Sequence, residues 1–470
     1  MTDHFPSPIA IRNLILPTPR GYETTDLTMA QGRIMALGKH IPTAATWIDG
    51  TGKLGLPGLV NAHTHSPEMW YRGLIPPLPL ELWLNILYQL PPLTPEQVYL
   101  SALWTAAETL LSGGTTVVDH LILTPGQELE TIAAAVRAYR ETGIRAFVGP
   151  LVQDRPFKEG VPGGTGVSAP GEVMDTKAVL ALLQAAVDQF HCPAEGIYIM
   201  VAPTGFQQVS DALFEGCCAL SERHQLRRHT HLLETKAQSL LAQEKYGGSA
   251  VAHLNELGFL GAQTSLAHGV WLQEDDWSIL ARTQSTVVHN PLSNLRLGSG
   301  IAPILAYRQA GVNVAIGCDG ACSNDGQDLL EAVKLGALLH NTTTFEYRHW
   351  LTPYNAIDMA ALGGAKGLAM ADQLGTLAVG KQADLVLYDL NQASLLPHTD
   401  PLGLLVRGRP SQVVHSAWVS GRQVIAQGQL TTIDLTTLHQ ALRDQAPALI
   451  RPVATVEPAL EAQYRAVMGL

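Results

Sequence analysis

Between residues 58 and 372, short apolar segments alternate with segments of helical periodicity, and this alternation constrains the fold more than any other feature of the chain. Strands that alternate with helices form parallel βαβ units. Eight such units predict an α/β fold, a closed (β/α)8 TIM-like barrel, with its chemistry at the carboxyl ends of the strands. We expect the strands over 59–63, 115–118, 145–148, 197–201, 226–231, 264–267, 285–288 and 312–317.

The helix after the first strand has clear boundary signals. Thr94-Pro95-Glu96-Gln97 is a capping box with proline at the first helical position, and an amphipathic run continues from it to Leu111. Gly113-Gly114 then predicts the end of the helix. Further helices are expected over 127–142, 176–190 and 210–224.

The two ends of the chain differ from residues 58–372, because they contain short β-like segments separated by turns and no alternation with helices. We expect residues 1–57 and 373–470 to pair into one small β-sandwich domain, with the barrel of residues 58–372 inserted between its parts. The last part also carries a C-terminal helical tail. The expected strands are 9–16, 25–29 and 33–37 before the barrel, and 375–379, 383–388, 413–419 and 422–426 after it.

One loop, over residues 152–172, is long and rich in glycine and proline. Long loops of a barrel either cover an active site or are disordered, and the sequence leaves both readings open.

Composition excludes several classes of function. The 470 residues carry a formal charge of −11 and no cluster of lysine or arginine, which argues against a nucleic-acid-binding surface. The five cysteines form no CxxC pair, as is typical of reduced thiols. No signal peptide and no run of about 18 apolar residues is visible, so we expect a cytoplasmic protein without membrane contact.

Histidine or aspartate follows five of the predicted strands. The first strand ends in His63 and His65, whose spacing places both imidazoles on one face of the strand, where they could share a cation. Taken alone, this pair is more often two satisfied histidines. Histidine and aspartate at four further strand ends are hard to explain as core filling, because both are poor core residues without partners. These are His229 with His231, then His268, His289 and Asp319.

The motifs at these strand ends, in this order, resemble the amidohydrolase superfamily over nearly the whole chain. They are most similar to its mononuclear cytosine-deaminase-like branch, which includes guanine, adenosine-homologue and triazine deaminases and chlorohydrolases. The motifs read NAHTH, HTHLLET, LAHG, HNPLSNLRLGSG and CDGACSND.

The resemblance implies a role for each position that matches. Glu234 would shuttle protons, His268 would contact the attacking water or the substrate, and Asp319 would also accept a proton. One divalent metal ion, zinc or iron, is implied, with attack by metal-bound hydroxide; three imidazoles and a carboxylate suit either ion. The implied metal ligands are His63, His65, His231 and Asp319.

Several alternatives stay open within this reading. His229 competes with His231 as a ligand, although the position three residues before Glu234 favours His231. His289 could orient Asp319, line the pocket or be a satisfied core histidine. The fourth strand contains no lysine that could bridge two metals, which favours one ion. The H-x-E and P-C-x-x-C signatures of other zinc deaminases are absent.

Two departures from the nucleoside-handling members concern the substrate. Leu90-Pro91-Pro92-Leu93 lacks their ribose-binding glutamate, and Pro203-Thr204-Gly205 lacks a histidine. A free base or compact heterocycle is therefore favoured. Tryptophan can stack on such a ring and glutamine can bind its edge. The predicted substrate-binding residues are Trp70, Gln153, Thr204, Gln207 and His289; Glu68 is a further candidate, and Trp83 is favoured as a core residue.

We therefore predict a hydrolytic deaminase that releases ammonia from a purine, pterin or triazine-like ring. The alternatives are a triazine-type chlorohydrolase or N-dealkylating hydrolase, a methylthioadenosine or S-adenosylhomocysteine deaminase, and a silent metal-binding scaffold. Glu234 argues against chloride as the leaving group, because chloride needs no proton. It also argues against a silent metal-binding scaffold, which has no chemical need for this carboxylate. Similar proteins predict a homodimer or a higher homo-oligomer.

Overall fold

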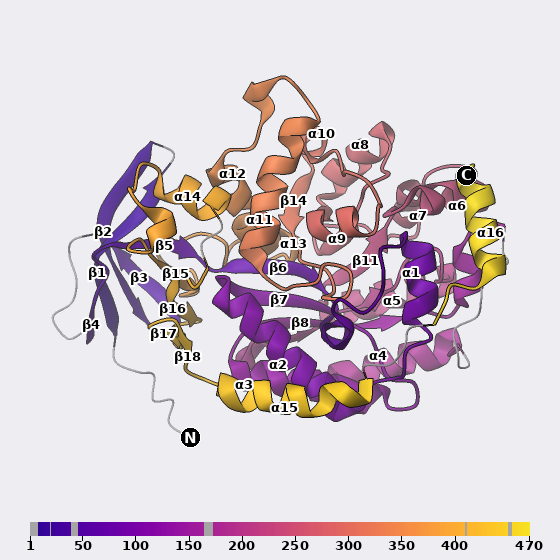
Figure 1. The fold of residues 1–470 in the computed structure, drawn as a ribbon, viewed down its shortest axis with the longest axis horizontal. Helices are drawn as coiled ribbons and strands as arrows, with labels where there is room; N and C mark the ends of the chain where they lie inside the picture. Colours follow the sequence, from indigo (N-terminus) through magenta and orange to yellow (C-terminus); the bar gives the residue numbers. More distant parts are fainter. Residues whose placement is uncertain (1–7, 19, 39–45, 164–172, 409–410, 450–453) are drawn as a thin grey trace.

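The computed structural model describes residues 8–18, 20–38, 46–163, 173–408, 411–449 and 454–470. The predicted (β/α)8 barrel is confirmed, and a small β domain lies at one end of it (Figure 1). Every strand of the barrel runs parallel to its neighbours. The barrel strands are β6 Leu59–Thr64, β7 Gly114–Leu121, β8 Arg145–Val152, β9 Ile197–Ile199 with β10 Ala202–Pro203, β11 Arg228–Leu232, β12 Thr264–His268, β13 Thr286–His289 and β14 Asn313–Ile316.

Single bridges and hydrogen bonds close the barrel between its two parallel sheets. On one side, parallel bridges join Val201 to Arg228 and Gly205 to His231. On the other side, the amide of Asp319 donates to the carbonyl of His63 at 2.9 Å. The closing contacts therefore lie among the residues that the sequence analysis singled out.

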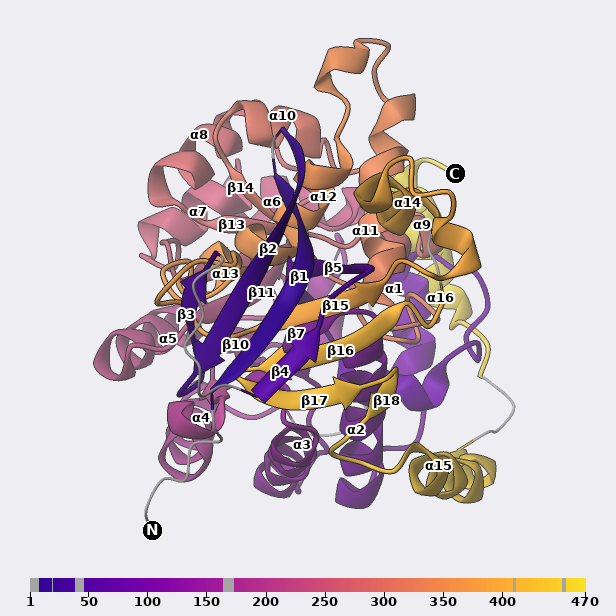
Figure 2. The same cartoon turned by 90° about the vertical axis from the view of Figure 1, so that its left-hand side faces the viewer.

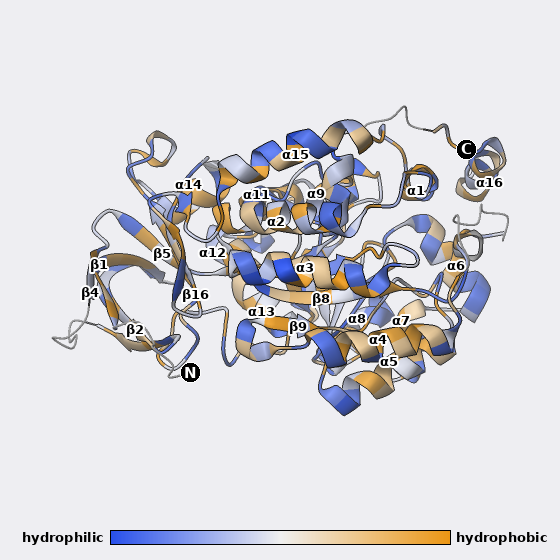
Figure 3. Cartoon of the chain, turned by 90° about the horizontal axis from the view of Figure 1, so that it is seen from below, coloured by the Kyte–Doolittle hydropathy of each residue, from blue (hydrophilic) through white to orange (hydrophobic). Residues whose placement is uncertain are grey.

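Helices surround the strands, and they begin where the sequence predicts. The Thr94–Gln97 capping box starts α2 Pro95–Leu111, as expected. Figure 3 shows the apolar strands β8 and β9 beside helices of mixed polarity, as expected for a buried parallel sheet. The other helices over the barrel are α3 Glu128–Thr142, α4 Thr176–Phe190, α5 Asp211–His224, α6 Lys236–Tyr246, α7 Ala250–Glu256, α8 Glu274–Thr283, α9 Pro291–Arg296, α10 Ile304–Gln309, α11 Leu329–Leu338, α12 Pro353–Asp358, α13 Gly364–Gly367 and α14 Pro401–Gly408.

Both chain ends form one nine-stranded sheet, in the order β18-β17-β16-β15-β5-β1-β2-β3 with β4 beside β1. The join between the ends is the antiparallel pair β5–β15, in which Leu56 lies opposite Val386. Figure 2 shows the N-terminal strands in indigo beside the C-terminal ones in orange and yellow. The strands are β1 Ile9–Thr18, β2 Gly21–Ala30, β3 Arg33–Leu37, β4 Thr46–Asp49, β5 Lys53–Pro57, β15 Leu385–Asp389, β16 Val414–Val419, β17 Arg422–Ala426 and β18 Gln429–Leu430.

One predicted strand of the small domain is wrong. Residues 375–379 form turns and irregular structure, because Gly375 adopts φ +82° and packs against the backbone of Leu362, which is incompatible with an extended strand. The sequence analysis also missed β4 and β5, since they are only four and five residues long.

The C-terminal tail contains two helices, α15 Leu435–Leu449 and α16 Pro458–Met468. Helix α15 lies along α2, and α16 packs against α6 and α1 Leu80–Leu87 (Figure 1). In the parts of the chain that the structure describes, no helix combines the length and apolar character that a membrane crossing requires.

A buried ion pair joins the barrel to the small domain. Arg145, at the start of β8, is 2% exposed and donates to both carboxylate oxygens of Asp384, at 2.5 and 2.9 Å. The same guanidinium donates to Ser420 Oγ at 2.6 Å and to the side-chain oxygen of Gln382. A planar, bidentate donor of this kind satisfies several buried acceptors at once.

We expect Arg145→Met to lower the free energy of unfolding by about 3–5 kcal/mol, because it leaves the Asp384 carboxylate buried without its cation. Urea titration followed by circular dichroism measures the loss. Arg137→Met is the matched control, since its pair with Glu141 is exposed and is worth below about 1 kcal/mol. Equal losses in the two variants would contradict the prediction.

Candidate metal centre and active-site cavity

Three imidazoles and one carboxylate converge at the carboxyl ends of β6, β11 and β14. His65 Nε2 lies 3.1 Å from His231 Nε2. Asp319 Oδ1 lies 3.3 Å from His63 Nε2 and 3.5 Å from His65 Nε2. Strand alternation turns His63 and His65 to the same side, and the barrel brings β11 and the residue after β14 to the same end.

The outer nitrogen of each imidazole has its own partner. His65 Nδ1 donates to the carbonyl of His120 at 2.6 Å, and His231 Nδ1 donates to the carbonyl of Thr204 at 2.6 Å. His63 Nδ1 lies 2.8 Å from His229 Nε2, whose other nitrogen lies 2.7 Å from Ser265 Oγ. These bonds orient the rings so that the Nε2 lone pairs point at one place, as outer partners of metal ligands do.

The donor set fits a divalent cation. His63 Nε2 is buried and has no hydrogen-bond partner among the described residues. Burial lowers the pKa of His63 to about 4 and the pKa of His231 well below its ordinary value, so both rings are neutral at pH 7. Neutral imidazoles beside a carboxylate are the ligands that zinc and similar ions bind.

Two residues of the cluster have strained backbones. Asp319 adopts φ 66° and His268 adopts φ 75°, in the left-handed region that side chains other than glycine disfavour. Such conformations cost on the order of 1–3 kcal/mol each and are concentrated at functional sites. Here Asp319 lies three residues after β14 and His268 is the last residue of β12, and the two side chains lie 3.9 Å apart at the imidazole cluster.

Glu234 lies beside this cluster. Its Oε2 is 3.5 Å from His268 Nε2, and Ser299 Oγ donates to its Oε1 at 3.3 Å. Burial first, and then the charges of Asp319 and Glu81, raise the pKa of Glu234 well above its usual range. A carboxyl group in such a place can hold a proton at neutral pH and exchange it with a neighbour.

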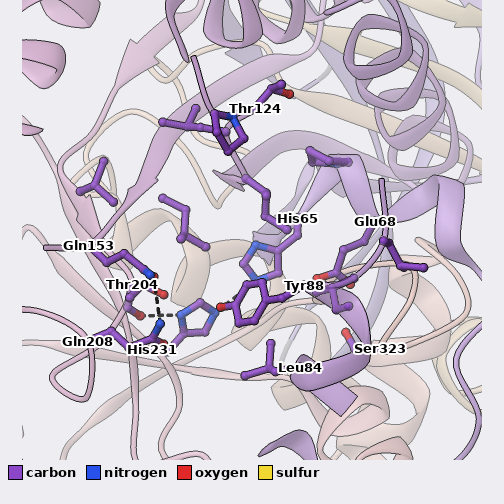
Figure 4. A pocket seen from close by; sticks show the side chains of 18 of the residues that line it. His65, Glu68, Leu84, Tyr88, Thr124, Gln153, Thr204, Gln208, His231 and Ser323 are labelled. Carbon is purple, nitrogen blue, oxygen red and sulfur yellow. Dashed lines mark hydrogen bonds between the residues drawn. The ribbon is translucent and has the colours of Figure 1, made fainter. Parts of the chain in front are cut away.

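A cavity of about 520 Å³ opens above the cluster. The residues His65, His231, Glu234, His268 and Asp319 line its floor. Three of the predicted substrate-binding residues line it as well: Gln153, Thr204 and Gln207. Figure 4 shows Gln153, Thr204 and Gln208 on the His231 side of this cavity, with Glu68 and Ser323 on the opposite side of His65.

Trp70 and His289, which the sequence predicted to bind substrate, do not line this cavity. The Trp70 indole donates to the carbonyl of Gln97 at 2.7 Å, which turns the ring into the core beside α2. His289 Nε2 lies 3.3 Å from His340 Nε2, so its ring packs behind β13. Trp83, favoured as a core residue, is buried and also lines the cavity.

Sequence reasoning missed Asp119 and His120. His120 is buried among the imidazoles of His63, His65 and His231, and its Nδ1 has no partner in the described part of the chain. Asp119 accepts hydrogen bonds from the amide and hydroxyl of Ser66 and so holds the turn after His65. Both residues lie near the end of β7 and directly follow the predicted strand over 115–118, so the rule applied to the other strand ends would have found them.

The loop over 152–172 lies partly outside the described residues, which end at 163 and resume at 173. In the described part, Phe157–Gly160 form a short 3-10 helix. Val173 and Met174, just after the gap, line the cavity. The described ends of the loop therefore border the active-site cavity.

The chain is similar in sequence to characterised deaminases. A family model described as "Amidohydrolase family" matches residues 55–424. The 5-methylthioadenosine/S-adenosylhomocysteine deaminase of Syntrophobacter fumaroxidans is 32% identical over 434 residues, which are 91% of this chain and 94% of the relative. The 8-oxoguanine deaminase of Pseudomonas aeruginosa is 31% identical over 454 residues, 94% of this chain and 98% of the relative.

Solved structures with bound zinc share the fold. A mutant of the atrazine chlorohydrolase from Arthrobacter aurescens TC1, complexed with zinc and atraton, superposes with a TM-score of 0.87 at 27% identity, over 93% of this chain and 100% of the other. An adenosine deaminase from Xanthomonas campestris with bound zinc gives a TM-score of 0.81 at 27% identity, over 93% of this chain and 99% of the other.

Proposed function

Since this chain belongs to the amidohydrolase family, it is a hydrolase of C–N bonds in cyclic amidines, and we propose that Glu234 carries the proton in its deamination reaction. The substrate is an amino-substituted N-heterocycle, and the products are the hydroxy or oxo ring and ammonia. The observation that supports this role is the position of the Glu234 carboxyl group. It is buried beside the converging imidazoles, and its Oε2 lies 3.5 Å from His268 Nε2.

His63, His65, His231 and Asp319 would hold one divalent ion in this proposal. Such an ion, when bound, supplies Lewis acidity that lowers the pKa of coordinated water to roughly 7. Zinc is the proposed ion, because the similar solved structures contain it and because imidazole and carboxylate ligands suit it.

Proton transfer falls to the chain's own residues. Glu234 accepts a proton from the attacking water and delivers it to a ring nitrogen or to the leaving amine. His268 Nδ1 lies 3.0 Å from Asn294 Oδ1, which orients the ring so that its Nε2 faces the carboxylates of Glu234 and Asp319, 3.5 and 3.9 Å away. Asp319, whose pKa His63 holds well below its usual range despite burial, stays ionised and can bind a developing positive charge.

The cavity favours a ring without a ribose. Its wall over 90–93 consists of Leu90, Pro91, Pro92 and Leu93, which offer no side-chain acceptor to sugar hydroxyls. The deaminases of methylthioadenosine and S-adenosylhomocysteine to which the chain is similar act on nucleosides. We propose that this protein instead acts on a free base or a compact heterocycle with apolar substituents.

Ammonia release from a panel of purines, pterins and aminotriazines tests the proposed function. We expect the zinc-loaded protein to release ammonia from at least one free heterocycle, and to act on it at least about tenfold faster than on the matching nucleoside. A coupled glutamate dehydrogenase assay measures the ammonia. If no ring of the panel gave ammonia, while a chlorotriazine released chloride or an alkylaminotriazine released an alkylamine, the deaminase proposal would be overturned in favour of the chlorohydrolase or N-dealkylating alternative.

A further inference from the structure

Glu81 is a buried carboxyl group that contacts the segment carrying Glu234. It lies in α1, and its side chain is 4% exposed. Thr235, the residue after Glu234, donates from its hydroxyl to Glu81 Oε1 at 2.5 Å. Glu81 does not line the active-site cavity, although Leu80 and Trp83 of the same helix do. Its contact with the site therefore runs through Thr235.

The segment that carries Glu234 is short and strained. Only Leu233, Glu234 and Thr235 separate β11, which ends at Leu232, from α6, which begins at Lys236. Leu233 adopts φ 46°, in the left-handed region that residues other than glycine disfavour. A backbone keeps such a conformation only while the surrounding contacts hold it.

Two hydrogen bonds hold this segment from the side of α6. The Glu234 amide donates to the side-chain oxygen of Gln238 at 2.8 Å, and the Gln238 amide donates to Thr235 Oγ1 at 3.2 Å. The second bond is the N-cap of α6. The Thr235 hydroxyl thus accepts from α6 and donates to Glu81, so it joins α6 to α1.

Helix α1 is itself fixed from outside the cavity. Leu82, next to Glu81, packs in one apolar cluster with Leu460 of α16, and this cluster is separate from the main core. The amide of Glu457, at the start of α16, donates to Asn85 Oδ1 of α1 at 3.1 Å. Figure 1 shows α16 beside α1 at this end of the barrel. These contacts hold the Glu81 carboxyl group in place against Thr235.

The hydrogen bond does not require a charge on Glu81. Burial raises the pKa of Glu81 above its ordinary value. An ionised carboxylate accepts from the Thr235 hydroxyl, and the carbonyl oxygen of a protonated carboxyl group accepts as well. The contact therefore orients Thr235 in either state, and a glutamine carbonyl can replace it.

We propose that Glu81 is a positioning residue for the reaction: by accepting from Thr235, it holds residues 233–235 in their strained conformation and keeps the Glu234 carboxyl group beside His268. Glu81 itself does not touch the substrate. This inference rests on the proposed function, because Glu234 carries the proton there.

Hydrogen-exchange mass spectrometry of the zinc-loaded protein tests the contact without turnover. Glu81→Leu removes the acceptor and leaves an apolar side chain of similar size. We expect peptides covering 232–239 to exchange about tenfold faster or more in this variant, because the amides of Glu234 and Gln238 lose the support of Thr235. Glu81→Gln should exchange as the wild-type protein does, because its carbonyl keeps the bond.

Asp276→Leu is the matched control. The Asp276 carboxylate is also buried and also accepts from the hydroxyl of a helix N-cap, Ser249 of α7, and neither residue lines the cavity. In this variant the peptides covering 249–253 should exchange faster, and those covering 232–239 should not change. Glu81→Leu should give the reverse pattern.

Ammonia release measures the consequence for the reaction. Glu81→Leu should lower kcat by about 10–100-fold, the effect of a misplaced catalytic group, and change KM by less than about threefold, because Glu81 does not line the cavity. Glu81→Gln should keep kcat within about threefold of wild type. In the Glu234→Gln protein, adding Glu81→Leu should lower the residual kcat by less than about twofold, because the group that Glu81 positions is already gone.

Unchanged exchange over 232–239 in Glu81→Leu overturns the inference, whether or not the protein releases ammonia. Equal losses of kcat in Glu81→Gln and Glu81→Leu, or a full further loss in the Glu234→Gln protein, also overturn it. If Glu81→Leu does not fold, Glu81→Asp replaces it, since its shorter side chain does not reach Thr235 Oγ1. The proposed function fails separately, when the wild-type protein releases ammonia from no ring of the panel.

Discussion

Replacing Glu234 by glutamine is expected to lower kcat for ammonia release by about 10²–10⁴-fold, the range for removal of a positioned general acid–base group. The amide keeps the shape of the side chain and its hydrogen bond with Ser299, but it cannot take a proton from water or return one to the leaving amine. Steady-state kinetics on the best substrate of the panel measures the loss, and KM should change little.

Ser299→Ala is the matched control for this prediction. It removes the hydroxyl that donates to Glu234 Oε1 at 3.3 Å and leaves the carboxyl group in place. We expect a loss of about tenfold or less, because a neutral hydrogen bond of this kind is worth about 0.5–1.5 kcal/mol. Equal rates from wild type and Glu234→Gln would remove Glu234 from the mechanism.

Removal of metal is expected to abolish ammonia release, and one equivalent of zinc per chain should restore it. The expectation of one ion follows from two overlapping groups of possible ligands that share His63: His63, His65, His120 and His231, and His63, His268 and Asp319. Asp319 also lies 3.5 Å from His65, so the two groups adjoin. Dialysis against a chelator, followed by zinc titration with activity and metal content measured together, gives the stoichiometry. Full activity only at two equivalents would contradict the single-ion prediction.

Two histidine variants separate ligands from core histidines. His231→Asn should lower zinc content sharply, because it removes one of the Nε2 atoms that point into the site. His289→Asn should retain zinc, because that imidazole pairs with His340 behind β13. Elemental analysis of the folded fractions makes the comparison, with circular dichroism to show that both variants fold.

The barrel could be predicted from the sequence because its signals are local. Most of the eight strands are short apolar runs, and several helix starts have their own capping residue, among them Thr94, Asp175 and Ser210. The turn at Gly375 could not be predicted in this way. A Cβ at this position would meet the backbone of Leu362 at 2.7 Å, and that contact lies outside the local pattern.

The sequence by itself placed most residues of the proposed metal site at one end of the barrel, although it missed His120. His63, His65, His231, Glu234 and Asp319 follow parallel strands, and the carboxyl ends of such strands reach the same end of a barrel whatever the loops do. The order of strands was therefore sufficient to place them together.

Only the tertiary structure decided which other side chains enter the cavity. Trp70 turns away from it because its indole binds the Gln97 carbonyl. Glu68 faces the cavity because Gly320 leaves room and two distant amides bind its carboxylate. In the irregular segments after the strands, side-chain direction depends on partners from other elements, often far along the chain, and no local periodicity encodes those partners.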